Sequence, residues 1–306
     1  MMKRFTALLL CIMIAAGTLC LSGCFQFISS LSDYSSYPAL WIIEDKEGHR
    51  CYLFGTNNTG KGEGDFPLPD IIEDAYSYCG AIAVEFDFTA KDAYEPVKYT
   101  DGTNIKSHLS ERVYNAAAAR IEAQEGGYNG QYDDYHVSEW YAMLENYACK
   151  TYGYSTEYGT DRYIINKAKA DGKKIYELES AEYQTNMTQS ISDRVYEYFI
   201  TTVLNSRGST SYDYYDQLYR SGDMTSLARA VDSGKSAAYS DAELKAQMDS
   251  YYDLMFTQRN KALAEKIMQF LSDGERVFVA VSCTHTVGED GIISVLQSNG
   301  YKVIRK

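Results

Sequence analysis

Apolar stretches of this chain end abruptly on polar side chains of the kinds that catalyse reactions or bind metals. The run FVAVSCT ends on His285, one of only four histidines. The run AIAV ends on Glu85, with Asp87 two residues further on, and RCYLFGT ends shortly before Asn58. Carboxylates together with a histidine suit a divalent metal, and a metal with an open coordination position activates water. These residues therefore raise the hypothesis of a metal-assisted reaction.

The elements that carry these residues read as strands at both ends of the chain. Residues 39–56 predict a hairpin with Gly48 in its turn, and AIAVEFDF predicts a buried strand. Further strands are expected at KKIYELE, RVFVAVSCT and YKVIRK, and the last two enclose a helix, as in a parallel crossover. The expected fold is α/β, a mixed sheet formed by N- and C-terminal strands with a large helical insertion in the middle.

Such a fold brings strand ends together. Ligand sites in open α/β sheets lie at the carboxyl ends of strands, so the loops after Thr56 and Thr284 are expected to meet there. Glu85 is costly to bury alone, and its partner is expected to be a metal, Arg259 or His285. By itself, a histidine at a strand end is more often a hydrogen-bonding residue than a metal ligand.

Three more residues are candidates for the same site. Glu179 ends the predicted strand IYEL, where it either joins the site or caps the following helix. Arg259 and Asn260 are adjacent on a predicted helix. They suit either a clamp on a substrate carboxylate or a pair on the helix surface.

In its order of motifs the chain resembles the TraB/GumN family, which includes the Tiki-type metalloproteases. The resemblance runs from about residue 38 to the end. It rests on PALWIIEDKEGHRCYLFGT, LPDIIEDAY, AVEFD, YGTDRYIINKAKADGKKIYELES, QRNKALAEKI and VAVSCTHTVGEDGIISVLQSNGYKV, in that order.

This resemblance implies two G-x-x-H motifs linked to metal-dependent peptide cleavage, and the chain departs from both. The first reads Gly55-Thr56-Asn57-Asn58, with Asn58 at the histidine position. The second has Ser282 at the glycine position and keeps His285. An amide oxygen is a poor zinc ligand but tolerable for Ca²⁺, Mg²⁺ or Mn²⁺.

Two other chemistries match parts of the sequence. GTNNTGKG is close to a phosphate-binding loop, but Gly62 stands where Ser or Thr would hold Mg²⁺. Cys283 with His285 two residues on could form a thiol nucleophile and its base, although most strand cysteines are inert.

Residues 1–23 resemble a lipoprotein signal peptide. A basic start, a short apolar run and LSG precede Cys24, which predicts cleavage and lipidation at that cysteine; in an ordinary signal peptide Cys24 has no such role. Residues 24–37 then form the lipidated Cys24 and a Ser-rich tether, and residues 38–306 a single domain. The expected location is the extracytoplasmic side of a bacterial cell membrane, with the lipid as the membrane contact.

The composition and charge of the chain argue against some classes of binding partner and metal site. The formal charge is −13, and loss of Lys3 and Arg4 with the signal makes it −15, which argues against nucleic acid. Cys51, Cys79, Cys149 and Cys283 lie far apart, which excludes zinc-ribbon spacing and leaves disulfides or buried thiols open. The 29 tyrosines indicate either a ligand surface or the apolar faces of helices.

Two functional hypotheses follow. In the first, the chain is a metal-dependent hydrolase acting on a peptide or protein. Glu85, His285 and Asn58 would bind Mn²⁺, Co²⁺, Zn²⁺ or Ca²⁺, Glu85, Glu179 and Arg259 would be catalytic, and Asp87, Arg259 and Asn260 would bind substrate. In the second, Asn58 marks a binding or scaffolding protein that has lost catalysis.

Overall fold

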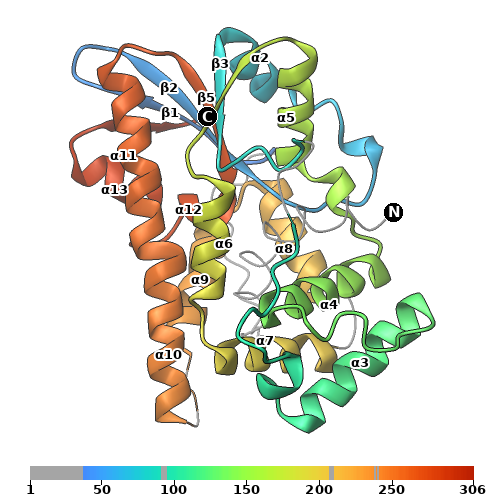
Figure 1. Ribbon diagram of the computed structural model, residues 1–306. Coiled ribbons are helices and arrows are strands. Elements are labelled where there is room, and N and C mark those ends of the chain that lie inside the picture. Colours follow the sequence, from blue (N-terminus) through green and yellow to red (C-terminus); the bar gives the residue numbers. More distant parts are fainter. Residues whose placement is uncertain (1–36, 91–94, 207–209, 238, 240) are drawn as a thin grey trace.

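The computed structural model describes residues 37–90, 95–206, 210–237, 239 and 241–306. Within them a mixed six-stranded sheet lies at one end of the molecule and most of the helices lie at the other (Figure 1). The predicted signal peptide and Cys24 fall outside the described residues. The strands are β1 (Leu40–Glu44), β2 (Arg50–Thr56), β3 (Ala81–Val84), β4 (Lys174–Glu177), β5 (Val277–Ser282) and β6 (Lys302–Arg305).

The strand order is β4-β3-β5-β2-β1-β6, which confirms the predicted α/β class with strands from both ends of the chain. β4, β3, β5 and β2 are parallel neighbours, whereas β1 is antiparallel to both β2 and β6. The register pairs Thr56 with Ser282, so the two loops expected to meet do meet. β6 therefore runs in the same direction as β5, but β2 and β1 lie between them.

Each face of the sheet buries its own hydrophobic core because strand side chains alternate. On β5, Phe278 and Ala280 pack with α2 (Asp70–Tyr78) and α5 (Thr160–Ala170). Val277, Val279 and Val281 point the other way, against α11 (Arg259–Ser272) and α13 (Ile292–Ser298). Burial of β5 on both faces explains its continuous apolar sequence.

The middle of the chain forms a helical region with a third core. Its tyrosines Tyr215, Tyr219, Tyr251 and Tyr252 are buried, which confirms that these residues form the inner faces of helices. The helices of this region are α3 (Glu111–Glu125), α4 (Val137–Thr151), α6 (Ala181–Gln189), α7 (Asp193–Asn205), α8 (Thr210–Ser221), α9 (Met224–Lys235) and α10 (Ala242–Tyr252).

Short helical turns complete the described part of the chain. Three are 3₁₀ turns: η2 (Glu63–Asp65), η3 (Ile105–Ser107) and η4 (Thr156–Tyr158). A short helix, α12 (Cys283–Thr286), follows β5 directly, so the predicted strand RVFVAVSCT ends earlier than expected, at Ser282.

A short π-helical segment connects α10 to α11. α10 continues through η5 (Asp253–Gln258) into α11 without a break in the chain direction (Figure 1). A π turn adds a residue to the helical repeat and rotates the side chains that follow it. Arg259 is the first residue after this turn, and it points into the protein rather than to the surface.

No helix among the described residues is long and apolar enough to cross a membrane. The four cysteines Cys51, Cys79, Cys149 and Cys283 are buried free thiols. The sequence left open whether these cysteines form disulfides or are buried thiols, and the structure shows buried thiols.

The packing of α13 on the sheet predicts a matched pair of stability effects. Leu296 is fully buried, and its neighbour Gln297 is exposed. Leu296→Ala should lower the free energy of unfolding by about 2–5 kcal/mol through lost burial and a residual cavity. Gln297→Ala should change it by less than about 0.5 kcal/mol. Urea denaturation measures both, and equal effects would contradict this packing.

Candidate functional site

Arg259 is the centre of a buried cluster at the strand ends. Its side chain is 0% exposed. Its Nε donates to Glu179 Oε1 and its Nη2 to Glu179 Oε2, both at 2.7 Å. Nη2 also donates to Glu85 Oε2 at 2.7 Å, and Nη1 lies 3.1 Å from His285 Nε2. One guanidinium thus binds three of the predicted site residues.

The sheet itself places the two carboxylates. Pairing between β3 and β4 continues past the strands, where the backbone N–H of Glu179 donates to the carbonyl of Glu85 at 2.8 Å. The second oxygen of Glu85 accepts from the backbone N–H of Ser282, at the end of β5, at 2.9 Å. Gln184 Nε2 donates to Glu179 Oε2 at 2.9 Å. Each carboxylate oxygen therefore already has a donor.

His285 is held in one tautomer by its two neighbours. A guanidinium only donates, so His285 Nε2 accepts from Arg259. The proton then sits on Nδ1, which lies 2.6 Å from Asn260 Oδ1 and donates to it. Asn260 Nδ2 in turn donates to the carbonyl of Asp290 at 2.9 Å, which fixes the amide orientation. Burial, with the charge of Arg259 adding to it, lowers the pKa of His285 to about 3.

Asn58 lies beside this cluster, across a small cavity of about 10 Å³. Thr56, Asn58, Glu85 and Asp161 are among the residues that line this cavity. Its volume is about that of one water molecule. Oxygen and amide groups from the ends of β2 and β3, the loops after them and α5 therefore surround a space beside Glu85, which Arg259 binds.

Asp161 is the site residue that the candidates taken from the sequence omit. Burial raises its pKa to about 7, and the charge of Glu85 adds to this shift. The sequence did contain a signal for this residue. Asp161 is the last residue of a Gly-x-Asp pattern that begins at Gly159, in one of the segments that carry the family resemblance. A Cβ at Gly159 would lie 2.5 Å from the carbonyl oxygen of Asn58, so glycine permits the close contact between the two segments.

Asp87 does not join the cluster. β3 ends at Val84, so the alternation that would put Asp87 beside Glu85 no longer applies. The carboxylate of Asp87 instead pairs with Lys169 on α5 at 2.7 Å and accepts from Thr89. The prediction that Asp87 lies at the site is therefore not supported by its contacts.

The predicted metal ligands do not fit a metal as they are arranged. The lone pair of His285 Nε2 faces the guanidinium of Arg259, and that guanidinium also occupies Glu85 Oε2. A divalent cation would have to lie beside this buried positive charge, which repels it. Among the described residues, no group of three or more His, Cys, Asp or Glu side chains is placed to hold a metal.

Neither alternative chemistry matches the structure. In the phosphate-loop-like segment, Gly62 precedes a three-residue 3₁₀ turn, and the next α-helix begins only at Asp70. Cys283 is fully buried, its Sγ lies 3.1 Å from the hydroxyl of Tyr215, and burial raises its pKa to about 12. A thiol in that state is a poor nucleophile.

Comparison with known proteins identifies the family. The model of the TraB/PrgY/gumN family matches residues 39–305. The chain belongs to the TraB/PrgY/gumN family. No curated protein and no solved structure matches it significantly. Within this TraB/PrgY/gumN chain, the segments that carried the resemblance supply Glu85, Asp161, Glu179, Arg259 and His285, the residues around the buried guanidinium and its cavity.

Removal of the Arg259 charge should destabilise the protein strongly. Arg259→Met leaves Glu85 and Glu179 without their cationic partner in a buried site, which should cost about 3–5 kcal/mol of unfolding free energy. Arg194 is the matched control, since it also pairs with two carboxylates, Asp241 and Glu243, but its side chain is 41% exposed. Arg194→Met should cost less than about 1 kcal/mol. Comparable losses in urea denaturation would show that the cluster does not hold the fold together.

The buried neutral His285 predicts a pH dependence of stability. Its pKa in the folded state is lowered from 6.5 to about 3, so the unfolded chain takes up a proton first as the pH falls. Its contribution to stability is therefore complete above pH 6.5 and is lost as the pH falls from 6.5 toward 3. The loss amounts to roughly 1.4 kcal/mol per pH unit.

The measurement is the pH dependence of urea unfolding for the wild type and His285→Gln. Below pH 6.5, the unfolding free energy of the variant should depend on pH less steeply than that of the wild type, by the amount that corresponds to uptake of about one proton. Gln297→Ala, an exposed change that removes no titratable group, should keep the wild-type slope. An unchanged slope in His285→Gln would mean that His285 is not held neutral.

Proposed function

We propose that this chain is a lipid-anchored, extracytoplasmic binding or scaffolding protein of the TraB/PrgY/gumN family. The observation that carries the proposal is the guanidinium of Arg259. It donates hydrogen bonds to Glu85, Glu179 and His285, which a metal-dependent enzyme would use to bind its metal and substrate. These residues therefore hold the strand ends, α11 and α12 together as a structural element.

The residue type at position 58, asparagine, supports the same proposal. The amide at position 58 stands where the family resemblance expects an imidazole, so the chain lacks one of two expected nitrogen ligands. The remaining imidazole, His285, is committed to Arg259 and Asn260. Loss of one ligand and commitment of the other both argue for binding without turnover.

The proposed location rests on the sequence. The apolar run and LSG before Cys24 favour lipid attachment at that residue. The acidic composition, with a formal charge of −13, favours a soluble domain held beside the membrane over one adsorbed to anionic lipid. The lipid is then the proposed contact with the bacterial membrane.

A metal-dependent hydrolase of the Tiki-like peptidase class is the second candidate. The small cavity favours it, because Thr56, Asn58, Glu85 and Asp161 surround a space of about 10 Å³. Asp161, with its pKa raised to about 7, suits a general acid or base at neutral pH. Among the cations considered, this oxygen-rich set would favour Ca²⁺ or Mn²⁺ over Zn²⁺.

Metal content distinguishes the two candidates. The purified full chain is incubated with Mn²⁺, Co²⁺, Zn²⁺ or Ca²⁺, desalted and measured by mass spectrometry of the elements. We expect far less than one metal per chain, because Arg259 occupies the acceptor atoms of the cluster. Glu85→Ala and His285→Ala serve as site variants, and Asn58→His restores the expected ligand type.

Near-stoichiometric metal in the wild type, lost in both alanine variants, would contradict the binding proposal. A peptide-cleavage screen would then follow, with Glu85→Ala as its inactive control. Metal gained only by Asn58→His would leave the wild type without metal, but it would show that Asn58, rather than the pairing of Arg259, keeps the metal out. Circular dichroism on each variant shows that the fold is retained.

A further inference from the structure

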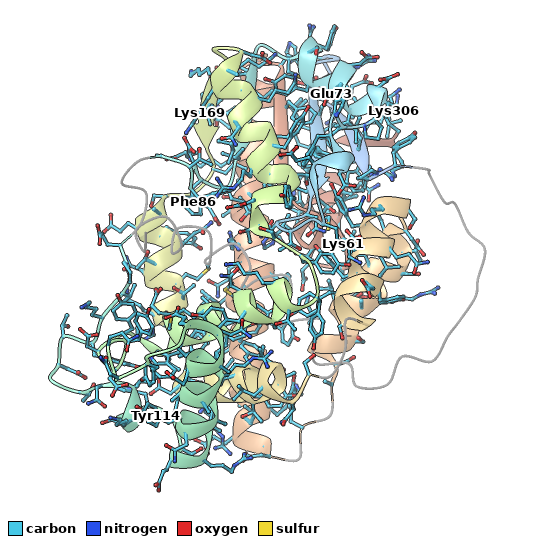
Figure 2. All side chains as sticks on the ribbon, turned by 90° about the vertical axis from the view of Figure 1, so that its right-hand side faces the viewer. Lys61, Glu73, Phe86, Tyr114, Lys169 and Lys306 are labelled. Atoms are coloured by element: carbon cyan, nitrogen blue, oxygen red, sulfur yellow. The ribbon has the colours of Figure 1, made fainter. Side chains whose placement is uncertain are left out.

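A polar groove lies between the Gly-rich loop after β2 and helix α8. It consists of two hollows of about 190 and 520 Å³ that share Asp216 and Arg220. Lys61, on the loop, lies where this loop meets α8 (Figure 2). The groove shares no lining residue with the small cavity beside Arg259. It is therefore a different place on the molecule from the cluster already described.

Two ion pairs connect the two walls of the groove, the loop after β2 and α8. Arg220 on α8 donates through Nη1 and Nη2 to the two oxygens of Asp65 in η2, each at 2.6 Å. Lys61 donates to Asp213 on α8 at 2.7 Å, and Tyr154 donates to the same oxygen at 2.8 Å. Each pair joins the loop to the helix, so the two walls of the groove are connected to each other.

Asp216 lies between these pairs, and only one of its two carboxylate oxygens has a hydrogen-bond donor. It is 8% exposed and lines both hollows. Its Oδ2 accepts from Arg220 Nε at 2.7 Å. Its Oδ1 is buried and has no hydrogen-bond partner in the described part of the structure. A buried acceptor without a donor is unfavourable, so a ligand that brings a donor to this oxygen gains a strong interaction.

The charges of the groove favour a cationic donor. Asp65, Asp213 and Asp216 supply three carboxylates, while Lys61 and Arg220 supply two cations, so one negative charge is in excess. Burial raises the pKa of Asp216 above its usual range, and a bound cation would reverse that shift. An ammonium group brings both the hydrogen-bond donor and the positive charge that this place lacks.

We propose that the groove binds a primary ammonium group, such as the free amino end of a peptide, through the carboxylate of Asp216. The ammonium group would donate to Oδ1 between the Lys61–Asp213 and Arg220–Asp65 pairs. The remainder of the ligand would lie along the wider hollow, beside Tyr154. This site works independently of the Arg259 cluster, so its test does not depend on metal binding or catalysis.

Isothermal titration calorimetry of the full chain tests the proposal with two probes at pH 7. Triglycine has a charged amino end at this pH, and N-acetyl-triglycine has none. Triglycine should bind at least about tenfold more tightly, as expected for one charge-assisted hydrogen bond. Asp216→Asn should abolish this preference, whereas Asp74→Asn, an equal charge change on the exposed side of α2, should keep it.

Equal affinity for the two peptides in the wild type would overturn the proposal, and so would an absence of triglycine binding. The latter result would mean that the groove offers no site for an ammonium group. If Asp216→Asn fails to fold, as judged by circular dichroism, the comparison of the two peptides on the wild type decides the question alone. A preference that survives in folded Asp216→Asn would place the ammonium elsewhere and also overturn the proposal.

Discussion

A guanidinium buried out of contact with water is stable only if acceptors surround it, and Arg259 imposes that requirement on the whole fold. Its acceptors come from segments far apart in the chain: Glu85 follows β3, Glu179 follows β4, and His285 lies on α12. These segments can meet only if the parallel strands align at their carboxyl ends. The π turn before Arg259 then directs its side chain toward them.

A second set of contacts ties the loop after β2 to the segment that leads into α5. Asn57 and Thr160 exchange hydrogen bonds of 2.8 and 2.9 Å, and Gly60 pairs with Ser155. These bonds hold Asn58 and Asp161 beside the cavity that Glu85 also lines. The same loop continues into the groove beside α8. One loop therefore contributes both to the cavity beside Arg259 and to the separate site that we assign to an ammonium ligand.

Family membership alone does not fix the chemistry of this chain. The TraB/PrgY/gumN match covers residues 39–305 and explains why the motifs occur in one order. The arrangement around Arg259, however, commits the acceptor atoms of Glu85, Glu179 and His285 to a cation that belongs to the protein itself. A shared fold does not guarantee a shared reaction, because the reaction depends on a few atoms whose partners a substitution such as Asn58 can change.

The sequence by itself determined the elements and most of the site. Alternation and apolar runs located the strands, and strand ends named Glu85, Glu179 and His285, because local periodicity reports which residues are buried. It also offered Arg259 as a partner of Glu85. Only the tertiary structure showed that Arg259 binds Glu85, Glu179 and His285, since these contacts depend on how α11 meets the strand ends. It likewise separated Asp87 from the cluster and brought in Asp161, because β3 ends one residue before Glu85 and the close contact at Gly159 joins segments about a hundred residues apart.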